Sequence, residues 1–192
     1  MGIKEHVEEE IMAFVPEYVD MLGNSTIVYT YKGGKKVVNK SIKTYINSLG
    51  KYFMLDLKEL KKYYGNILGV SKTVPIPFAQ NYVFIPFKTR VPLCKNDGAY
   101  GYVNIDYIEN VAEVKGHVVI CLKSSWEICS LSSKKSVEKY LKQGLIVKEL
   151  CMERKPIYTD ERDFYEEYDK PATKGDIAML RGDIIKIMET LN

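Results

Sequence analysis

Short runs of β-branched and aromatic residues, each followed by turn-forming residues, limit the fold of this chain more than any other feature. Such runs form strands, and two of them joined by a tight turn form an antiparallel hairpin. Three pairs are found, at residues 25–31 and 35–38, 74–78 and 82–87, and 118–122 and 126–131. Gly33 and Gly34 supply the positive φ that the first turn requires. In the second pair, Pro75, Pro77 and Pro86 predict edge strands, because proline cannot donate to a neighbouring strand.

Helical spacing of apolar residues appears between and after these hairpins. Ser41 and Asp56 can cap two helices between the first and second hairpins, since their side chains can accept hydrogen bonds from the free N–H groups of a first turn. Ser132 or Ser133 can cap a third helix, which Gly144 can end. These signals predict an α+β fold, in which two small antiparallel β units carry packed helices and the chain ends form further helices.

Both ends of the chain predict an amphipathic helix. Residues 1–23 repeat apolar side chains at helical spacing and carry six acids against one lysine, with Pro16 as an interruption. Residues 156–172 are expected to form an acidic linker, and residues 173–192 an association helix. The apolar stripe of that helix consists of Ile177, Leu180, Ile184, Ile187 and Leu191. The stripe is shorter than three heptads, so packing on the chain's own core explains it as well as assembly into a homo-oligomer does.

Charge is sorted along the chain. Residues 24–155 hold 22 Lys and Arg against 10 Asp and Glu, a balance of +12, whereas residues 1–23 carry −5 and residues 156–192 carry −4. A basic body suits contact with a polyanion such as double-stranded DNA, because each neutralised phosphate releases counterions. A solvated, lysine-rich surface explains the same balance without a ligand.

The basic residues of the body gather in three groups, each beside Ser, Thr or Asn residues that can bond to phosphate oxygens. These candidate DNA contacts are Lys58, Lys61 and Lys62; Lys88, Thr89, Arg90, Lys95 and Asn96; and Lys123, Ser124, Ser125, Lys134, Lys135, Lys139 and Lys142. Arg90 is the first candidate for reading a base edge or a narrow AT-rich minor groove, since a guanidinium is a planar fork and an ammonium is a point charge. The alternative is that Arg90 ties down its own loop by pairing with Asp97 or Asp106.

The sequence gives little support for catalysis, metal binding or a membrane span. Cys94, Cys121, Cys129 and Cys151 form no C-x-x-C pair, and the chain has two His, which argues against a zinc site and a disulfide framework. Phosphate-loop and metalloprotease motifs are also missing. No apolar run approaches the roughly 20 residues of a membrane helix. We therefore expect a cytoplasmic protein that uses no cofactor or metal, does not contact a membrane and is not an enzyme.

The order of these signals resembles that of the ComK family of bacterial competence transcription factors. The resemblance spans residues 40–150 and rests on Val74-Pro75-Ile76-Pro77, the segment VFIPFKTRVPLC at 83–94, the segment YVNIDYI at 102–108, and the join from Ile128 to Glu138. It implies an activator that recognises AT-rich promoter boxes, bends DNA and acts as an oligomer. A regulatory adaptor protein is a further candidate partner. The hairpin followed by a basic helix is also similar in outline to LytTR-type DNA-binding domains.

The sequence thus predicts a ComK-like transcription regulator that binds AT-rich promoter DNA through residues 24–155. The alternative is a protein-interaction module, an adaptor or inhibitor whose basic face meets a nucleoprotein or an acidic partner. A nucleic-acid-processing enzyme is a third hypothesis.

Overall fold

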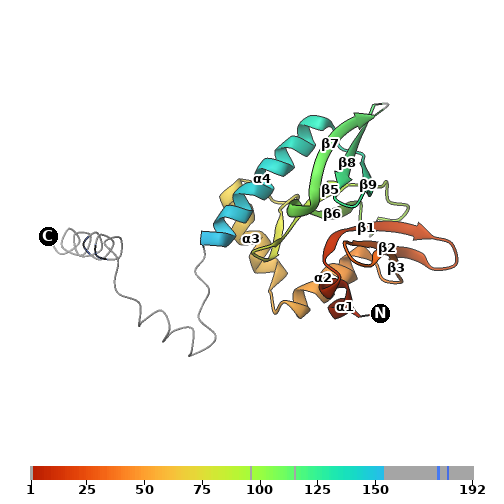
Figure 1. Cartoon of the computed structure of the whole chain (residues 1–192), viewed down its shortest axis with the longest axis horizontal. Helices are drawn as coiled ribbons and strands as arrows, with labels where there is room; N and C mark the ends of the chain where they lie inside the picture. The colour runs from red at the N-terminus through yellow and green to blue at the C-terminus, as the bar shows by residue number, and fades with distance from the viewer. Residues whose placement is uncertain (1, 96, 115, 154–176, 178–180, 182–192) are drawn as a thin grey trace. The chain divides into compact units, whose positions relative to one another are not determined.

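Two antiparallel sheets form the framework of the protein in this computed structural model, which describes residues 2–95, 97–114, 116–153, 177 and 181 (Figure 1). The larger sheet contains β1 (Ile11–Val19), β2 (Gly23–Thr30), β3 (Gly34–Val38), β4 (Ile76–Ala79), β5 (Tyr82–Lys88) and β6 (Tyr100–Asn104). Its strand order is β3-β2-β1-β6-β5-β4. The smaller sheet contains β7 (Ile108–Val114), β8 (His117–Leu122) and β9 (Glu127–Ser130), in that order. The predicted α+β class and the three predicted hairpins are confirmed.

Helices begin where the sequence places capping residues. The helical elements are α1 (Ile3–Glu8), α2 (Ile42–Tyr52), α3 (Leu57–Leu68), the 3-10 turn η1 (Ile105–Tyr107) and α4 (Lys134–Glu153). Ser41 Oγ accepts from the Thr44 N–H at 3.3 Å, and Asp56 Oδ1 accepts from the Lys58 N–H at 2.8 Å. Both hydrogen bonds satisfy a donor that the first helical turn leaves free.

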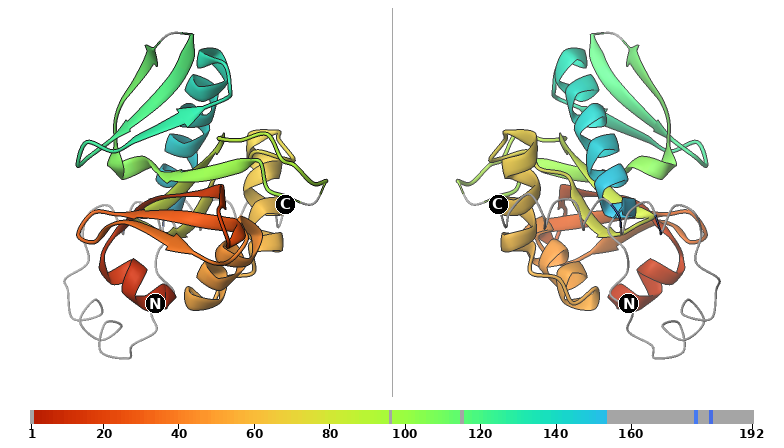
Figure 2. Two further views of the ribbon diagram at one scale, coloured as in Figure 1. Left: turned by 90° about the vertical axis from the view of Figure 1, so that its right-hand side faces the viewer. Right: turned by 90° about the vertical axis from the view of Figure 1, so that its left-hand side faces the viewer.

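The larger sheet is covered on both faces (Figure 2). On one face lie α1 and α2, whose apolar residues pack with Phe14, Phe78 and Phe84 of the sheet. On the other face, the smaller sheet and the start of α4 pack with strand residues that include Ile85 and Phe87. A third cluster joins α3 and α4 beside the β4–β5 hairpin. The core therefore lies in two layers, one on each side of the six strands.

The N-terminal segment differs from its prediction. The helix expected over residues 1–23 is limited to α1, and β1 follows it as an interior strand between β2 and β6. Two of the acids at this end, Glu9 and Glu10, are paired with the basic body. Lys36 donates to Glu9, Lys32 pairs with Glu10 at 2.5 Å, and the Tyr107 hydroxyl donates to Glu10 at 2.6 Å. These hydrogen bonds lower the pKa of both carboxyls. Part of the acidic end is therefore built into the body.

A β-bulge explains why β1 has helical spacing in its sequence. The pairing register of β1 with β2 shifts between Ile11 and Ala13. As a result, Ile11 and Phe14 pack in the α2 layer, whereas Met12, Ala13 and Val15 pack in the layer of the smaller sheet. An extra residue in a strand turns the period of two into a local spacing of three, which is also the spacing of a helix.

The edge position predicted for the proline-containing strands holds for β4 and is wrong for β5. β5 pairs with β4 on one side and with β6 on the other, where Pro86 lies opposite Tyr102. Pairing with β4 starts at Ile76, which lies opposite Phe84. Pro86 is therefore beyond the end of β4, and a residue without an N–H can occupy an interior strand there.

The third helix also differs from its prediction. α4 continues through Gly144 to Glu153, so Gly144 does not end it. A Cβ at Gly144 would lie 2.5 Å from Cδ1 of Ile85 and 3.3 Å from Cδ1 of Ile105. Glycine is needed here because α4 passes close over β5.

The C-terminal predictions fall mostly outside the described residues. Residues 1–153 and 154–192 form separate units. The predicted acidic linker at 156–172 lies outside the described part of the chain. Of the predicted association stripe, the structure describes Ile177, which is helical and exposed. The stripe therefore stays a prediction.

We expect Gly144→Ala to lower the free energy of unfolding by about 1–2 kcal/mol, because the added methyl group overpacks the contact with Ile85. Ile85→Val removes the atom nearest that methyl group and should recover part of the loss in the double variant. Chemical denaturation measures both effects, with Leu145→Ala on the exposed side of α4 as the control. A Gly144→Ala variant as stable as the unchanged protein would contradict the close approach of α4 to β5.

Candidate nucleic-acid interface

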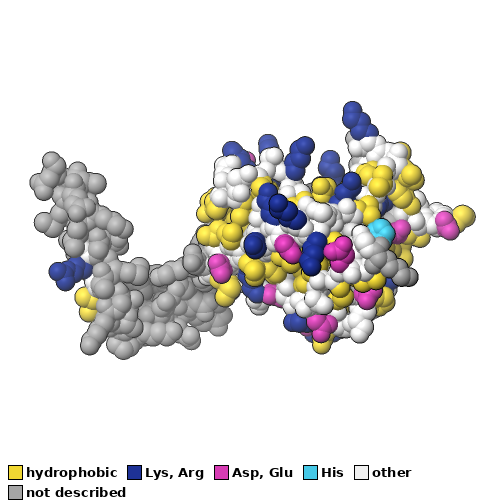
Figure 3. Space-filling view, turned by 90° about the horizontal axis from the view of Figure 1, so that it is seen from above, with side chains coloured by type: hydrophobic (Ala, Val, Ile, Leu, Met, Phe, Trp, Pro, Cys, Tyr) yellow, Lys and Arg dark blue, Asp and Glu magenta, His cyan; other side chains and the backbone are white. Residues whose placement is uncertain are grey.

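The outward side of α4 carries a group of lysines. Its members are exposed and are Lys134, Lys135, Lys139 and Lys142. The opposite side of the helix is buried through Val137, Gly144 and Val147. Figure 3 looks down on the upper part of the molecule in Figure 1, where α4 lies, and shows Lys and Arg side chains gathered on that face. We call the four lysines the α4 basic face.

Hydroxyl groups accompany these lysines at the start of α4. Ser133 Oγ accepts from the Ser136 N–H at 3.3 Å, so Ser133 is the cap of the helix. Both serines lie in a hollow of about 620 Å³ together with Lys135, Lys139 and Lys142, and one acid, Glu138, also lines it. Hydroxyl and ammonium donors in one hollow can bind the oxygens of a phosphate group.

The loop that leads from β5 to β6 lies next to the start of α4. The Leu131 N–H, just before α4, donates to the carbonyl of Lys88 at 2.7 Å. Thr89 follows Lys88, and its hydroxyl is buried and has no hydrogen-bond partner among the described residues, so it is not placed to contact a ligand. Lys95 is exposed further along this loop, and Asn96 lies outside the described residues. The predicted loop group and the α4 part of the third predicted group therefore meet here.

The guanidinium of Arg90 is engaged inside this loop. Nε donates to the carbonyl of Gly98 and Nη2 donates to Oδ1 of Asn24, each at 2.7 Å. Cζ lies 4.1 Å from the centre of the Tyr18 ring, which is a cation–π contact. The Arg90 and Thr89 N–H groups also donate to the carbonyl of Ala99. Arg90 thus fastens the outgoing arm of the loop to the returning arm and to the end of β1.

Asp97 completes this cluster from the other side. Its carboxylate accepts from the Tyr18 hydroxyl at 2.5 Å and from Nδ2 of Asn24 at 2.9 Å. The Tyr18 hydroxyl in turn accepts from the Leu93 N–H at 2.8 Å. Burial and the hydrogen bond to Asp97 raise the pKa of Tyr18. Asp97 therefore reaches Arg90 through shared partners, and the second acid considered for Arg90, Asp106, pairs instead with Lys148.

Apolar side chains are exposed at the tip of this fastened loop. Val91 is 69% exposed and Leu93 is 78% exposed, on either side of Pro92. The tip of the loop is therefore apolar.

The α3 group reaches the same loop from the opposite side. Lys58 and Lys62 are exposed, and Lys62 lies 3.7 Å from Glu59. Lys61 is partly buried and lines a cavity with Gly98 and Ala99 of the loop. The β5–β6 loop is therefore flanked by α3 and by the start of α4.

The β8–β9 turn is separate from this arrangement. Ser124 and Ser125 have φ values of 75° and 62°, as a tight hairpin turn requires. The Lys123 ammonium lies 5.7 Å from the centre of the Tyr107 ring, in a hollow that also contains Lys148. β9 separates this turn from the first residue of α4, so Lys123, Ser124 and Ser125 do not join the α4 basic face.

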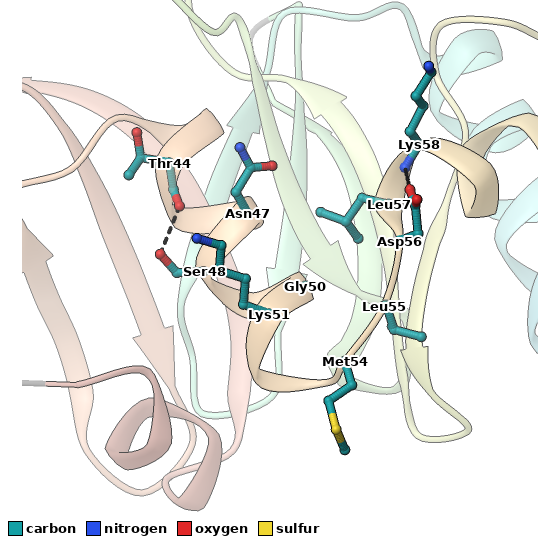
Figure 4. A pocket seen from close by; sticks show the side chains of 10 residues that line it. All are labelled: Thr44, Asn47, Ser48, Gly50, Lys51, Met54, Leu55, Asp56, Leu57 and Lys58. Atoms are coloured by element: carbon teal, nitrogen blue, oxygen red, sulfur yellow. Dashed lines mark hydrogen bonds between the residues drawn. The ribbon is translucent and has the colours of Figure 1, made fainter.

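A hollow of about 760 Å³ lies between the end of α2 and the start of α3 (Figure 4). Leu57 points toward Gly50 in this view, whereas the Lys58 ammonium points away from the hollow. The Asp56 carboxylate there is used in capping α3. The hollow does not contain a nucleophile with an adjacent base, so its chemistry is that of a surface groove.

Tyr18 and Asn24 are the residues of this region that sequence reasoning missed. They lie in β1 and β2, far from Arg90 in the chain, and no local pattern connects them to the loop.

Within the described ranges, His, Cys, Asp and Glu do not gather in threes that could hold a metal ion. No described helix is long and apolar enough to cross a membrane.

The chain matches no protein-family model, no curated protein and no solved structure.

We expect Arg90→Ala to destabilise the β5–β6 loop, because two hydrogen bonds and the stacking on Tyr18 are lost together. Each charged hydrogen bond contributes about 1.5–3 kcal/mol. Limited proteolysis should then cut the variant within residues 88–100 faster than the unchanged protein. Lys95→Ala, an exposed lysine in the same loop, is the control. Equal cutting rates for Arg90→Ala and the unchanged protein would mean that Arg90 does not hold the loop.

Proposed function

We propose that this protein is a DNA-binding transcription regulator. The observation that carries the proposal is the α4 basic face, where four exposed lysines share one side of a helix whose other side is buried. Lysines on such a face neutralise phosphates along a duplex, which is the main source of affinity in DNA binding. The resemblance to the ComK family in residues 40–150 supports the same function.

The fastened β5–β6 loop gives the proposed interface a second part. We assign Arg90 a positioning role, because Nε and Nη2 already donate to Gly98 of the loop and to Asn24 of β2. Val91 and Leu93 at the loop tip are then the residues offered to DNA. Aliphatic side chains of this kind insert between base steps from the minor groove and bend the duplex. AT-rich steps present the narrow groove that attracts nearby lysines such as Lys88 and Lys95.

Under this proposal the protein acts in the cytoplasm, where bacterial promoters lie, and it acts without catalysis. It binds promoter DNA as a homo-oligomer, with residues 173–192 as the association element. An adaptor protein that regulates it is a further proposed partner, in line with the family resemblance.

Affinity for duplex DNA should fall steeply with salt, because several counterions are released on binding. Lys135→Gln with Lys139→Gln should weaken binding to all sequences about equally. It should also reduce the logarithmic salt slope by about one unit for each lost phosphate contact. Fluorescence anisotropy with a labelled duplex measures both quantities.

The matched control is Lys35→Gln with Lys40→Gln, which removes the same charge on and beside β3, at the sheet edge opposite β4. The control variant should keep the slope of the unchanged protein. An equal loss in both variants would show that net charge matters and the α4 basic face does not. A flat salt response of the unchanged protein would favour the protein-interaction module.

Deletion of residues 173–192 should leave the body folded and lower the molecular mass in light scattering, because the proposed association stripe is removed. The shortened protein should also lose its preference for two binding boxes in helical phase over a single box, since tethering makes the second contact intramolecular. Unfolding or aggregation of the shortened protein would instead mean that the stripe belongs to the chain's own core.

A further inference from the structure

A cavity of about 340 Å³ lies where α2, α3 and the returning arm of the β5–β6 loop meet. Its apolar lining comes from Ile42, Ile46 and Tyr102, and two lysines, Lys43 and Lys61, reach it from α2 and α3. Asn47 and Tyr100 add an amide and a hydroxyl. None of the described residues that line the cavity is acidic. The volume lies within the range of small-molecule sites, which combine an apolar lining with a few polar groups.

Lys61 is the unusual residue of this cavity. Its side chain is partly buried, and burial alone lowers its pKa. No described residue forms a hydrogen bond or an ion pair with its ammonium. The neighbouring acid on the same helix, Glu59, lies by Lys62 instead. Because even a partly desolvated ammonium without a counter-charge is unfavourable, an anion that entered the cavity would be stabilised there.

The wall of the cavity that the β5–β6 loop forms is fixed by packing. A Cβ at Gly98 would lie 2.2 Å from Cγ2 of Ile42, so only glycine allows the loop this close to α2. Arg90 Nε also donates a hydrogen bond to the Gly98 carbonyl. Ala99, the next residue, receives two backbone hydrogen bonds. The cavity is therefore formed before any ligand arrives, which lowers the entropic cost of binding.

We propose that this cavity binds a small organic anion in which a phosphate group is attached to a flat ring, the class that includes nucleoside monophosphates. Lys43 and Lys61 supply the charge for the phosphate. The Tyr102 ring and the two isoleucines supply a surface for the ligand ring. The cavity shares no lining residue with the α4 basic face or with Val91 and Leu93 at the loop tip.

Calorimetric titration of the full-length protein with adenosine monophosphate, in the absence of DNA, tests the proposal. We expect saturable binding of one molecule per chain. Lys61→Met should weaken it at least about tenfold, which is the effect of losing one charge-assisted hydrogen bond. Lys58→Met, one turn earlier on α3 and outside this cavity, is the matched control and should bind as the unchanged protein does.

Three outcomes of this titration would overturn the proposal. They are the absence of saturable binding, binding of inorganic phosphate as tight as that of the nucleotide, and equal weakening by Lys58→Met and Lys61→Met. Thermal melting of each variant shows that it is folded. Since DNA is absent, failure here leaves the proposed regulator function standing, and failure of DNA binding leaves this site standing.

Labelling of the unchanged protein provides a second test that needs no variant. Pyridoxal 5′-phosphate is a flat-ring phosphate with an aldehyde, which condenses with an uncharged amine to an imine and releases water. Borohydride then reduces the imine to a stable amine. Mass spectrometry should find the label first at Lys61, and adenosine monophosphate should protect that residue. Labelling spread evenly over the exposed lysines would contradict the site.

Discussion

The pairing of β1 with both β2 and β6 is the constraint on which the rest of the structure depends. β2 and β3 form one hairpin, and β4 and β5 form another with β6 alongside, so β1 alone joins the two halves into one sheet. Residues 11–14 of this strand are fully buried. The same strand ends at Tyr18 and Val19, where the Arg90 cluster is fastened. The position of the β5–β6 loop therefore depends on the strand that unites the sheet.

The elements that could be predicted from the sequence are those fixed by near neighbours. Ser41, Asp56 and Ser133 cap helices through contacts within three residues, and the hairpin turns depend on their own backbone conformations. β1 could not be predicted, because its bulge gives a strand the spacing of a helix and its burial is created by strands far along the chain. The edge position predicted from Pro86 and the helix end predicted at Gly144 are wrong for a related reason. Pro86 fits an interior strand because the pairing with β4 ends before it, and Gly144 lies inside α4 because β5 packs closely against it.

The candidate site divides in the same way. The lysines of the α4 basic face could be predicted because helical spacing puts them on one side of a single element. That Arg90 ties down its own loop was open as an alternative to base reading, but its partners Tyr18 and Asn24 could not be predicted, because they are more than 60 residues away in the sequence. The two proposed sites meet at the loop that Arg90 holds. Its tip carries the exposed Val91 and Leu93, which we propose contact the duplex, and its returning arm lines the cavity with Lys61.

The central claim is that the basic body recognises AT-rich duplex DNA. The most direct measurement compares binding of the full-length protein to an AT-rich duplex and to a GC-rich duplex of equal length and charge, at one salt concentration. Both duplexes carry the same phosphates, so the difference reports groove shape and flexibility. We expect the protein to bind the AT-rich duplex, and so to shift its mobility in a gel, at concentrations that leave the GC-rich duplex free. Equal binding to both duplexes, or binding to neither, would contradict the account.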